Sequence, residues 1–591
     1  MQAIRKLAQS PLTTIVPALA ILLIVFGAPT VQLFLESMNA PNFSLQNYYL
    51  FFGQYANFRV LLQTLEISAV ATFICLVVGY PTAYLISTAS KRARVILIVL
   101  VVIPYLTSGL ARTYSWIVIL GDTGLINSVL MDHGFISSPF PLIYNRSAVY
   151  VGMVHIMLPM MILPIVSVMM GIDTSLIAAA KSMGARPSTA FWRVYFPLSI
   201  PGVRGGTLLV FVICLGFYIT PAALGGLGDA MLSTFIASQV STGYDMGSIS
   251  ASSFILLAIT LMLLSVFGLN LSGGQDAAPK PPKVSYQRLA ILRLIRSYFN
   301  EISVSSRAKR WPIELYRARM NAGWSRISAR VILALVMFFL LFPELVVIIM
   351  SFSEGATLQF PPTGLSLQWY TSFFNNEAWY GAAWTSVKIG LAVAGVSTVV
   401  GTLAAYGLSR VGFGLRSFIT MIILTPITIP VIVVGVASYF GLANLGLIGT
   451  ETGVILAHTI GGISYVVVIV AATLANFDTR LEQAAKSMGA RPFTAFIRVT
   501  LPLSRPGLVA GALFAFIHSF DEVVTTSLVS GYSVRTLPLK MWENIRNEID
   551  PTVAAVASLL TLLPIIWMIA LYIAWWRERA RSQVVMLEGV A

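Results

Sequence analysis

Long runs of apolar residues, separated by short polar stretches, dominate the chain from end to end. Each run is close to the ~20 residues that a helix needs to cross a membrane, so the pattern predicts about twelve membrane-spanning helices. In the first half, spans are predicted at residues 12–35, 60–88, 95–120, 148–172, 203–225 and 249–271. In the second half they are predicted at residues 329–352, 384–409, 416–441, 452–475, 507–529 and 553–576.

The composition supports the same fold class. Of the 591 residues, 57% are hydrophobic and only 10% are charged, and the mean hydropathy is +0.83. A soluble domain cannot bury that much apolar surface, so we expect an all-α polytopic membrane protein. The two cysteines, Cys75 and Cys214, both lie inside apolar runs, which excludes a disulfide framework and a cysteine-based metal site.

Lysine and arginine residues fall on every second loop, and the loops between them are nearly neutral, acidic or of mixed sign. The positive-inside rule therefore places the basic loops and both termini on the cytoplasmic side of a bacterial inner membrane. The net charge of +15 does not indicate nucleic-acid binding, because the basic residues cluster between spans. Arg5 and Lys6 precede an apolar run that is too long for a signal peptide, so this run is predicted to be a retained first span.

A polar nine-residue stretch occurs twice. Residues 179–187 and residues 484–492 both read AAKSMGARP, and the similarity continues without a gap through Pro197 and Pro502. A chemically mixed match at one fixed offset indicates a duplication. The chain is therefore predicted to hold two homologous six-helix bundles, at residues 1–271 and 329–591, fused through a basic cytoplasmic linker at residues 272–328.

Each copy of the repeated stretch favours a short helix, because its first part is rich in Ala, Leu and Lys. Gly184 or Gly489 then offers a helix C-cap, and the proline three residues later prevents simple continuation of the helix. A match this long between otherwise divergent halves predicts that each loop docks on a shared or duplicated partner. The alternative is an ordinary cytoplasmic loop retained from the duplication.

The two loops resemble the EAA loop of ABC importer permeases, whose pattern is E-A-A, three residues, Gly, nine residues and then I-x-L-P. The pattern runs from Gln483 to Pro502 in the second half and from Ala178 to Pro197 in the first, with its spacing kept in both. The chain departs from the pattern at the acidic position, which Gln483 and Ala178 occupy. Glu482 lies one place earlier in the second copy.

In that family each half uses this loop as a coupling helix, seated in a groove of one cytoplasmic ATPase subunit. The resemblance implies that closure of the ATPase dimer switches the bundles between inward-facing and outward-facing states, while a separate solute-binding protein delivers the substrate. The near-identity of the loops favours an ATPase homodimer. The coupling residues implied are Ala179, Lys181, Gly184, Arg186, Pro197, Glu482, Gln483, Ala484, Lys486, Gly489, Arg491 and Pro502.

The resemblance also implies that ATP and Mg are bound by the partner ATPase and that this chain holds no cofactor. The sequence agrees, since it has no G-x-x-x-x-G-K-[ST] phosphate-binding loop. Nothing in it is typical of a hydrolytic triad or a metal-ligand cluster, so we expect a transport subunit and not an enzyme.

The chain looks most like the spermidine/putrescine branch of these permeases. The residues that carry this likeness are 215–221 in the first half, and 519–524, 535–539 and 542–558 in the second. The likeness implies a small organic cation, a polyamine or a related compound, as substrate. The same broader group includes permeases for ferric iron, thiamine, opines and phosphonates, and these stay open as alternatives.

Two acidic residues, Asp521 and Glu522, lie deep in a predicted span. A charge at membrane depth costs about 2.5–3.5 kcal/mol on insertion scales, so it normally faces a bundle interior or water. The first half has aromatic residues, Phe217 and Tyr218, at the corresponding place. Acids opposite aromatic rings suit an organic cation, through charge pairing and cation–π contact. The alternative is that the acids lie near the outer interface or form a structural ion pair with a basic residue such as Arg535.

Four further polar residues lie within predicted spans. His155 and His458 are in corresponding fourth spans, where hydrogen bonds that pack helices are favoured over a proton relay. Glu66 and Glu344 are weaker pathway candidates, because both are predicted near the ends of their spans.

The linker begins with a proline-rich stretch that cannot be helix interior. Residues 286–302 then alternate apolar residues with arginines, which fits a basic helix lying on the anionic lipid of the inner leaflet. A solvated tether with a few apolar residues explains the pattern equally well.

Two other classes of function compete with an importer permease. An ion-coupled secondary transporter should bury acids or histidines in both halves and has no need for a docking loop in each half. An assembly scaffold does not need paired loops either. The repeated loops therefore favour the permease.

Overall fold

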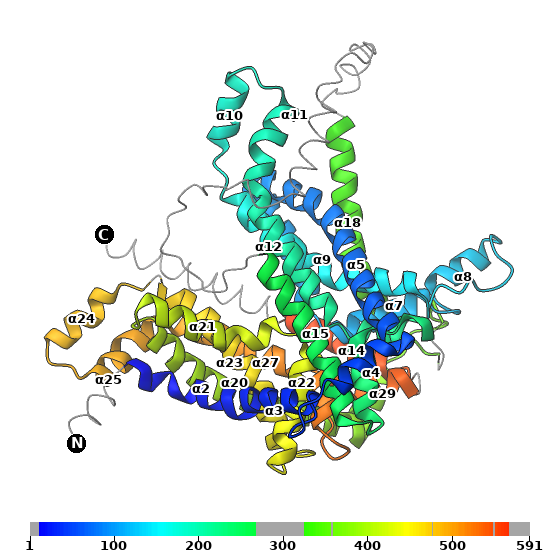
Figure 1. The fold of residues 1–591 in the computed structure, drawn as a ribbon. Coiled ribbons are helices and arrows are strands. Elements are labelled where there is room, and N and C mark those ends of the chain that lie inside the picture. The colour runs from blue at the N-terminus through cyan, green and yellow to red at the C-terminus, as the bar shows by residue number, and fades with distance from the viewer. Residues whose placement is uncertain (1–10, 268–323, 356–358, 476, 548–549, 567–591) are drawn as a thin grey trace.

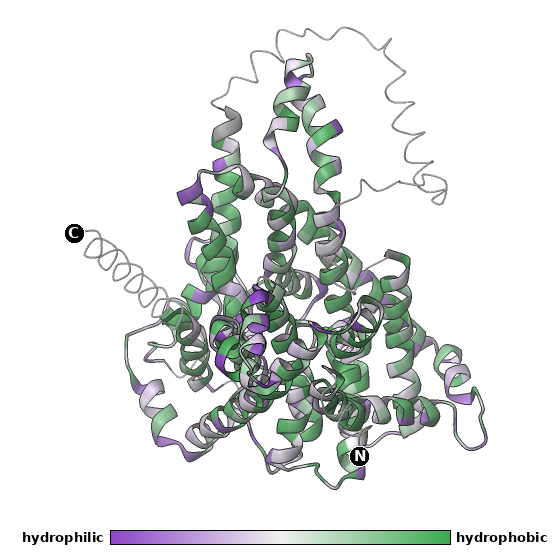
Figure 2. Ribbon diagram, turned by 90° about the vertical axis from the view of Figure 1, so that its left-hand side faces the viewer, coloured by the Kyte–Doolittle hydropathy of each residue, from purple (hydrophilic) through white to green (hydrophobic). Residues whose placement is uncertain are grey.

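The protein is helical throughout the part that its structure, a computed structural model, describes. That part comprises residues 11–267, 324–355, 359–475, 477–547 and 550–566. Strand-like pairing is limited there to one isolated bridge between Ser353 and Leu365. Apolar residues cover most of the long helices (Figure 2), so the predicted all-α polytopic class is confirmed.

The helices of the first half follow the predicted order of spans. The first two spans and the loop between them are η1 (Pro11–Thr14), α2 (Val16–Leu22), η2 (Leu23–Gly27), α3 (Ala28–Ser37), α4 (Gln46–Gly53) and α5 (Tyr55–Thr88). They are followed by α6 (Lys91–Leu106), α7 (Gly109–Leu120), α8 (Leu125–Asp132), α9 (Arg146–Met170), α10 (Thr174–Ser182), α11 (Pro187–Ala190), η3 (Phe191–Tyr195), α12 (Phe196–Leu215), α13 (Ile219–Leu224), η4 (Leu227–Asp229), α14 (Leu232–Ser241) and α15 (Met246–Phe267).

The second half repeats this order. Its helices are α18 (Trp324–Met350), α19 (Gln368–Asn375), α20 (Glu377–Leu408), α21 (Phe413–Thr428), α22 (Val431–Asn444), α23 (Glu451–Ala475), α24 (Thr479–Ser487), α25 (Pro492–Ala495), η5 (Phe496–Thr500), α26 (Leu501–Leu503), α27 (Arg505–Phe520), α28 (Val524–Val529) and α29 (Leu537–Asn547). An apolar helix at Thr552–Ile566 lies where the twelfth span is predicted. The predicted linker lies outside the described residues as far as residue 323.

By length and composition, nine helices among the described residues can cross a membrane. Two further helix pairs qualify if each is counted as one bent span. One pair is α21 with α22, bent by 101°, and the other is Pro492–Leu503 with α27, bent by 76°.

The third span of each half is broken, where the sequence predicted continuous helices at 95–120 and 416–441. The breaks fall between α6 and α7 and between α21 and α22. Pro104 and Pro426 lie in the last turn of the first helix of each pair, and Pro430 directly precedes α22. Proline lacks an amide N–H and disfavours helical geometry in the residue before it, so Pro104 and Pro426 weaken the last turns, and Pro430 follows an extended Ile429.

The first span of each half reaches the opposite half, although α3 also packs against α15 of its own half. Helix α3 packs against α22, and η1 and α2 pack against α20, whereas α18 packs against α5, α6 and α7 (Figure 1). Two hydrogen bonds fix α18 in this position. The His155 imidazole Nε2 lies 3.1 Å from the Leu340 carbonyl oxygen, and the Thr107 hydroxyl donates to Glu344 Oε1 over 3.1 Å. The two halves are therefore interlocked through their first spans.

Candidate functional site

The duplicated sequence forms the same structure twice. We call residues 173–197 repeat loop 1 and residues 478–502 repeat loop 2. In each, an aspartate caps the short helix: Asp173 Oδ1 accepts from the Ser175 N–H over 2.8 Å, and Asp478 Oδ1 accepts from the Arg480 N–H over 2.9 Å. Hydrogen bonds from Ser175 hold the pKa of Asp173 below its usual range. A carboxylate at this place also favours the helix through its dipole.

A glycine ends the helix in each loop. Gly184 and Gly489 have φ angles of +85° and +89°, in the left-handed region, and no heavy atom lies within 4 Å of a Cβ built on either. In both loops the next N–H bonds back to the carbonyl five residues earlier, from Ala185 to Ala180 and from Ala490 to Ala485, each over 3.0 Å. This is a Schellman cap, so the glycine is required by its backbone angle and not by lack of space.

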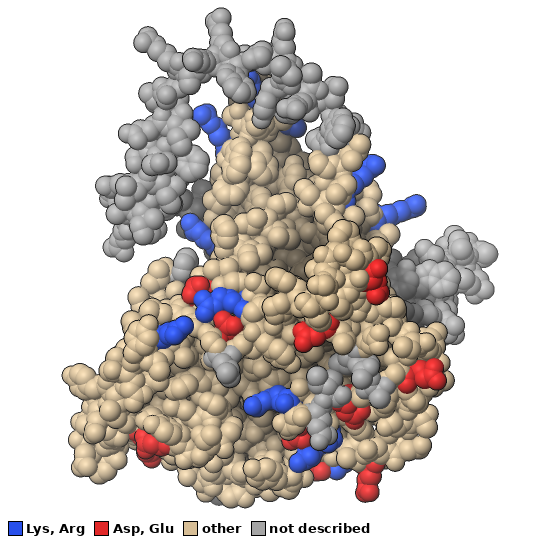
Figure 3. All heavy atoms as spheres, turned by 90° about the vertical axis from the view of Figure 1, so that its right-hand side faces the viewer, with Lys and Arg blue, Asp and Glu red and all other residues tan. Residues whose placement is uncertain are grey.

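Both loops present their most exposed apolar side chain at the same position. Met183 is 82% exposed and Met488 is 83% exposed, and the neighbouring aromatic residues Trp192 and Phe493 are also exposed. In Figure 1, α10 and α24 project from the ends of the two bundles, away from α8 and α29. On the face drawn in Figure 3, the end of the molecule that carries α10 shows Lys and Arg, whereas the rest of this face shows Asp and Glu together with further Lys and Arg.

Most of the predicted coupling residues lie on the outer surface of these loops. The exposed ones are Ala179, Lys181, Gly184, Arg186, Pro197, Gln483, Ala484, Lys486, Gly489 and Arg491, and Pro502 is half-buried.

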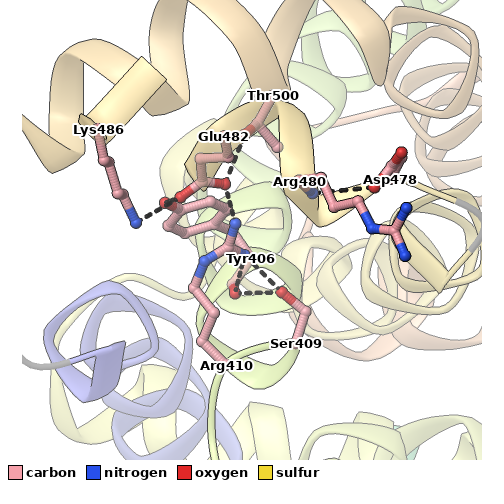
Figure 4. A network of polar contacts seen from close by, with 8 residues as sticks. All are labelled: Tyr406, Ser409, Arg410, Asp478, Arg480, Glu482, Lys486 and Thr500. Carbon is pink, nitrogen blue, oxygen red and sulfur yellow. Dashed lines mark hydrogen bonds and ion pairs between the residues drawn. The ribbon is translucent and has the colours of Figure 1, made fainter. Parts of the chain in front are cut away.

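Glu482 differs from the other residues of its loop, because its side chain is only 3% exposed and points into the protein (Figure 4). It accepts hydrogen bonds from the Tyr406 hydroxyl over 3.0 Å and the Thr500 hydroxyl over 2.9 Å. It also forms ion pairs with Arg410 and, over 2.8 Å, with Lys486. Glu482 therefore ties α24 to α20 and η5. Tyr406, Arg410 and Thr500 were not predicted, since nothing in their own local sequence indicates this contact.

These four donors determine the charge state of Glu482. Burial alone would raise the pKa of this carboxyl, but the hydrogen bonds and positive charges that surround it outweigh burial and lower its pKa below 4.5. The residue is therefore ionised at neutral pH. A cavity of about 840 Å³ lies beside it, between α21 and the pair α20 and α23, and Arg416, Gln483 and Lys486 contribute to its lining.

The two predicted pathway acids sit where the fifth span of the second half stops. The Asp521 carboxylate crosses to the first half, where it accepts from the Ser108 hydroxyl over 2.5 Å and from the Gly109 N–H over 3.1 Å. It therefore lies at the N-terminus of α7, directly after the break in the third span. Glu522 Oε1 accepts from the Thr525 N–H over 2.8 Å, at the start of α28.

The ion pair suggested between these acids and Arg535 is absent from the described residues, where Arg535 pairs with Glu543 over 3.1 Å. The serine and glycine that receive Asp521 could not be predicted, because they belong to the other half. Their signal in the sequence is only the proline that precedes the break, Pro104.

The aromatic pathway candidates lie at the corresponding place in the first half. Tyr218 is buried and its ring meets Trp542 of the second half edge-to-face, with centroids 5.5 Å apart. Phe217 is half-buried, and its carbonyl accepts from the Ser233 hydroxyl. A Cβ built on the neighbouring Gly216 would lie only 2.7 Å from Pro430 Cβ, so this glycine packs directly against the broken third span of the second half.

The two histidines and the two further glutamates that the sequence singles out in the spans have structural partners. His458 bonds to the Ser519 hydroxyl over 2.8 Å and to the Thr526 hydroxyl over 2.9 Å. With the contact from His155 to α18, this confirms the interpretation of both histidines as helix-packing residues. Glu66 pairs with Arg146 over 3.1 Å and remains half-exposed. No group of three or more His, Cys, Asp or Glu residues that could hold a metal ion occurs in the described part of the chain.

Known proteins match both halves. Residues 75–273 and 397–577 each match the family described as binding-protein-dependent transport system inner membrane component. The spermidine/putrescine transport system permease protein PotB of Haemophilus influenzae is 35% identical over 208 residues, which cover 35% of this chain and 73% of that protein. PotC of the same system in Escherichia coli K12 is 31% identical over 238 residues, which cover 39% of this chain and 88% of that protein.

One similar solved structure is the crystal structure of a bacterial alginate ABC transporter in complex with an alginate pentasaccharide-bound periplasmic protein. The similar region covers 43% of this chain and 90% of that chain. The TM-score is 0.37 and the sequence identity is 16%. Two family matches in series, the all-helical fold and the two repeat loops lead to one conclusion. The chain belongs to the family of binding-protein-dependent transport system inner membrane components and is an importer permease with two halves fused in one polypeptide.

Proposed function

We propose that the chain is the transmembrane subunit of an ATP-driven importer for a small organic cation of the polyamine type. The observation that carries this proposal is the pair of repeat loops, because one chain presents the same capped helix twice, once at the end of each bundle. The names of the relatives PotB and PotC support a polyamine as substrate.

The repeat loops are the coupling elements of this importer. Each offers an exposed methionine, an exposed lysine and an exposed arginine on the same backbone, so each seats in the groove of one ATPase subunit. Because the two surfaces are alike, the ATPase is a homodimer, and it binds ATP and Mg. The loops, both termini and the linker at 272–328 face the cytoplasm of the bacterium, whereas a solute-binding protein delivers the cation to the opposite end.

The breaks in the spans form the path for the cation. In this structure Asp521 rests on the N-terminus of α7, whose partial positive charge stabilises the carboxylate. When the ATPase drives the halves apart at this point, Asp521 loses both donors. An ammonium group of the substrate takes their place, with Glu522, Phe217 and Tyr218 beside it.

Native mass spectrometry of the protein, purified gently from its own membranes, tests the assembly. We expect two copies of one ATPase per chain and a co-purified binding protein whose ligand is a polyamine. Uptake of radiolabelled spermidine into proteoliposomes, with and without ATP, then tests the activity. A lone chain that transports spermidine without ATP would make it a secondary carrier.

A further inference from the structure

The repeat loops are joined to their bundles at positions that correspond through the duplication. Residues 79–88 and 401–410 of the two second spans align without a gap and share a glycine, an alanine, a tyrosine and a serine at the same places, so Tyr84 corresponds to Tyr406. The other corresponding pairs are Thr88 with Arg410, Ile177 with Glu482, Phe191 with Phe496 and Tyr195 with Thr500. We call the contact among these residues joint 1 in the first half and joint 2 in the second.

Joint 2 is built around a buried charge. Glu482 receives four donors, and the Arg410 guanidinium also lies over the Tyr406 ring, 3.6 Å from its centroid. The Tyr406 ring meets Phe496 with centroids 4.4 Å apart. The hydrogen bonds and ion pairs of Glu482 are directional, so they hold α24 to α20 in one orientation.

Joint 1 is aromatic and contains no charged residue. The Tyr84 ring meets Phe191 and Tyr195 edge-to-face, with centroids 5.4 Å and 5.2 Å apart. The Tyr195 hydroxyl bonds to Ser87 over 3.0 Å, and Ile177 packs against the same apolar cluster. Apart from one hydrogen bond between neutral hydroxyls, joint 1 is therefore held by ring and aliphatic contacts, none of which depends on a charge.

The two joints therefore differ in how they respond to a change of one residue. Removing the charge of Glu482 leaves Arg410 and Lys486 side by side without a counter-charge, so α24 loses several contacts together. Joint 1 has no charged residue whose neutralisation would leave other charges unpaired, because its contacts centre on the rings of Phe191, Tyr84 and Tyr195. The tyrosine and the phenylalanine are common to both joints, so the difference lies in the three positions occupied by Arg410, Glu482 and Thr500.

We propose that repeat loop 2 is coupled to its bundle through a charge-dependent joint that repeat loop 1 lacks, and that Glu482 is the positioning residue of this joint. Glu482 acts through α20 and η5 and does not contact the ATPase. Identical ATPase subunits would then act on the two halves through unlike connections. The coupling role rests on the proposed function above, whereas the difference between the joints does not.

Hydrogen–deuterium exchange of the purified permease tests the joint without any partner. In Glu482→Gln, the amides of α24 should exchange at least about tenfold faster, because hydrogen bonds to a charged group are lost. Helix α10 in the same sample is the internal control and should not change. The triple variant Arg410→Thr, Glu482→Ile, Thr500→Tyr builds joint 1 into the second half and should restore slow exchange of α24.

Spermidine uptake with the complete transporter tests the coupling. Glu482→Gln should lower ATP-driven uptake about tenfold, within the usual range of coupling between sites, while two ATPase copies stay bound. The triple variant should recover most of the uptake. Glu377→Gln, the same change at an exposed glutamate at the other end of α20, is the matched control and should transport normally.

Three results would overturn the inference. Unchanged exchange of α24 in Glu482→Gln would show that the carboxylate does not hold the loop, and loss of the ATPase from this variant would show that Glu482 docks the partner directly. A triple variant with exchange and uptake as impaired as those of Glu482→Gln would show that the contacts of joint 1 cannot replace those of joint 2. If exchange behaves as expected but the unaltered protein shows no ATP-driven uptake, the proposed function fails and the joint stands.

Discussion

Asp521 accepts a hydrogen bond from the Ser108 hydroxyl over 2.5 Å, and the two residues belong to different halves of the chain. The duplication gives this contact a counterpart. When the two halves are aligned on their repeat loops, Gly216 corresponds to Asp521. When they are aligned on their second spans, Pro430 corresponds to Ser108. Gly216 and Pro430 are also packed together. Each fifth span therefore ends on the broken third span of the other half, once through a charge and once through apolar contact.

Neutralising Asp521 should impair transport of a cation. We expect Asp521→Asn to lower kcat/KM for spermidine uptake at least about tenfold, because a hydrogen bond or ion pair to a charged group is worth about 1.5–3 kcal/mol. Ser108→Ala is the control, since it removes a hydrogen-bond donor to Asp521 but keeps the negative charge of Asp521 that would bind the substrate. Equal losses in both variants would reduce Asp521 to a structural role.

A side chain at Gly216 should destabilise the contact between the halves. Gly216→Val places atoms within 3 Å of Pro430, where a Cβ alone would lie 2.7 Å and 2.9 Å from its Cβ and Cα. Overpacking of this kind costs about 1–3 kcal/mol, so the Tm of the purified protein should fall. Gly205→Val in α12 is the matched control, because no heavy atom lies within 4 Å of its Cβ. Equal Tm values for the two variants would contradict the packing.

The sequence predicts what local patterns determine. The spans follow from apolar runs, and the shape of the repeat loops follows from Asp173, Gly184 and their counterparts, because caps depend on residues a few positions away. Glu482 shows the limit of this reasoning. Its position in the loop is obvious, but Tyr406 and Arg410 lie 76 and 72 residues away, so its inward orientation could not be predicted.

The broken third spans and the exchanged first spans show the same limit. Pro104 and Pro426 mark places where a helix is weakened, but many membrane helices continue past a proline. The break can be recognised as a contact between the halves only because Asp521 of the second half binds there, at the start of α7. Likewise, α18 has the same apolar pattern whichever bundle it packs against, so its place on the first half depends on contacts that no single segment encodes.

Both repeat loops should require glycine at the helix end. Gly489→Leu forces a side chain into the left-handed region, which costs about 1–2 kcal/mol, although the space around it is empty. The loop should lose its cap and ATP-driven uptake should fall without a loss of membrane insertion, and Gly184→Leu should behave alike. Gly412→Leu, at a φ of −59° and in open space, should transport normally. Normal uptake by Gly489→Leu would refute a coupling role for the loop.

The contribution of Glu482 to stability should disappear only in acid. Its folded-state pKa lies below the ordinary value of 4.5, so the ionised form is favoured by folding. A group with a lowered pKa stabilises the protein fully above its unfolded pKa and loses that effect as the pH falls through the folded pKa. The gap in Tm between the unaltered protein and Glu482→Gln should therefore be constant from about pH 8 to about pH 6 and should narrow below about pH 4. Thermal unfolding in detergent across this range measures the gap, and a gap that widens in acid would mean that the four donors do not hold the carboxylate in its ionised form.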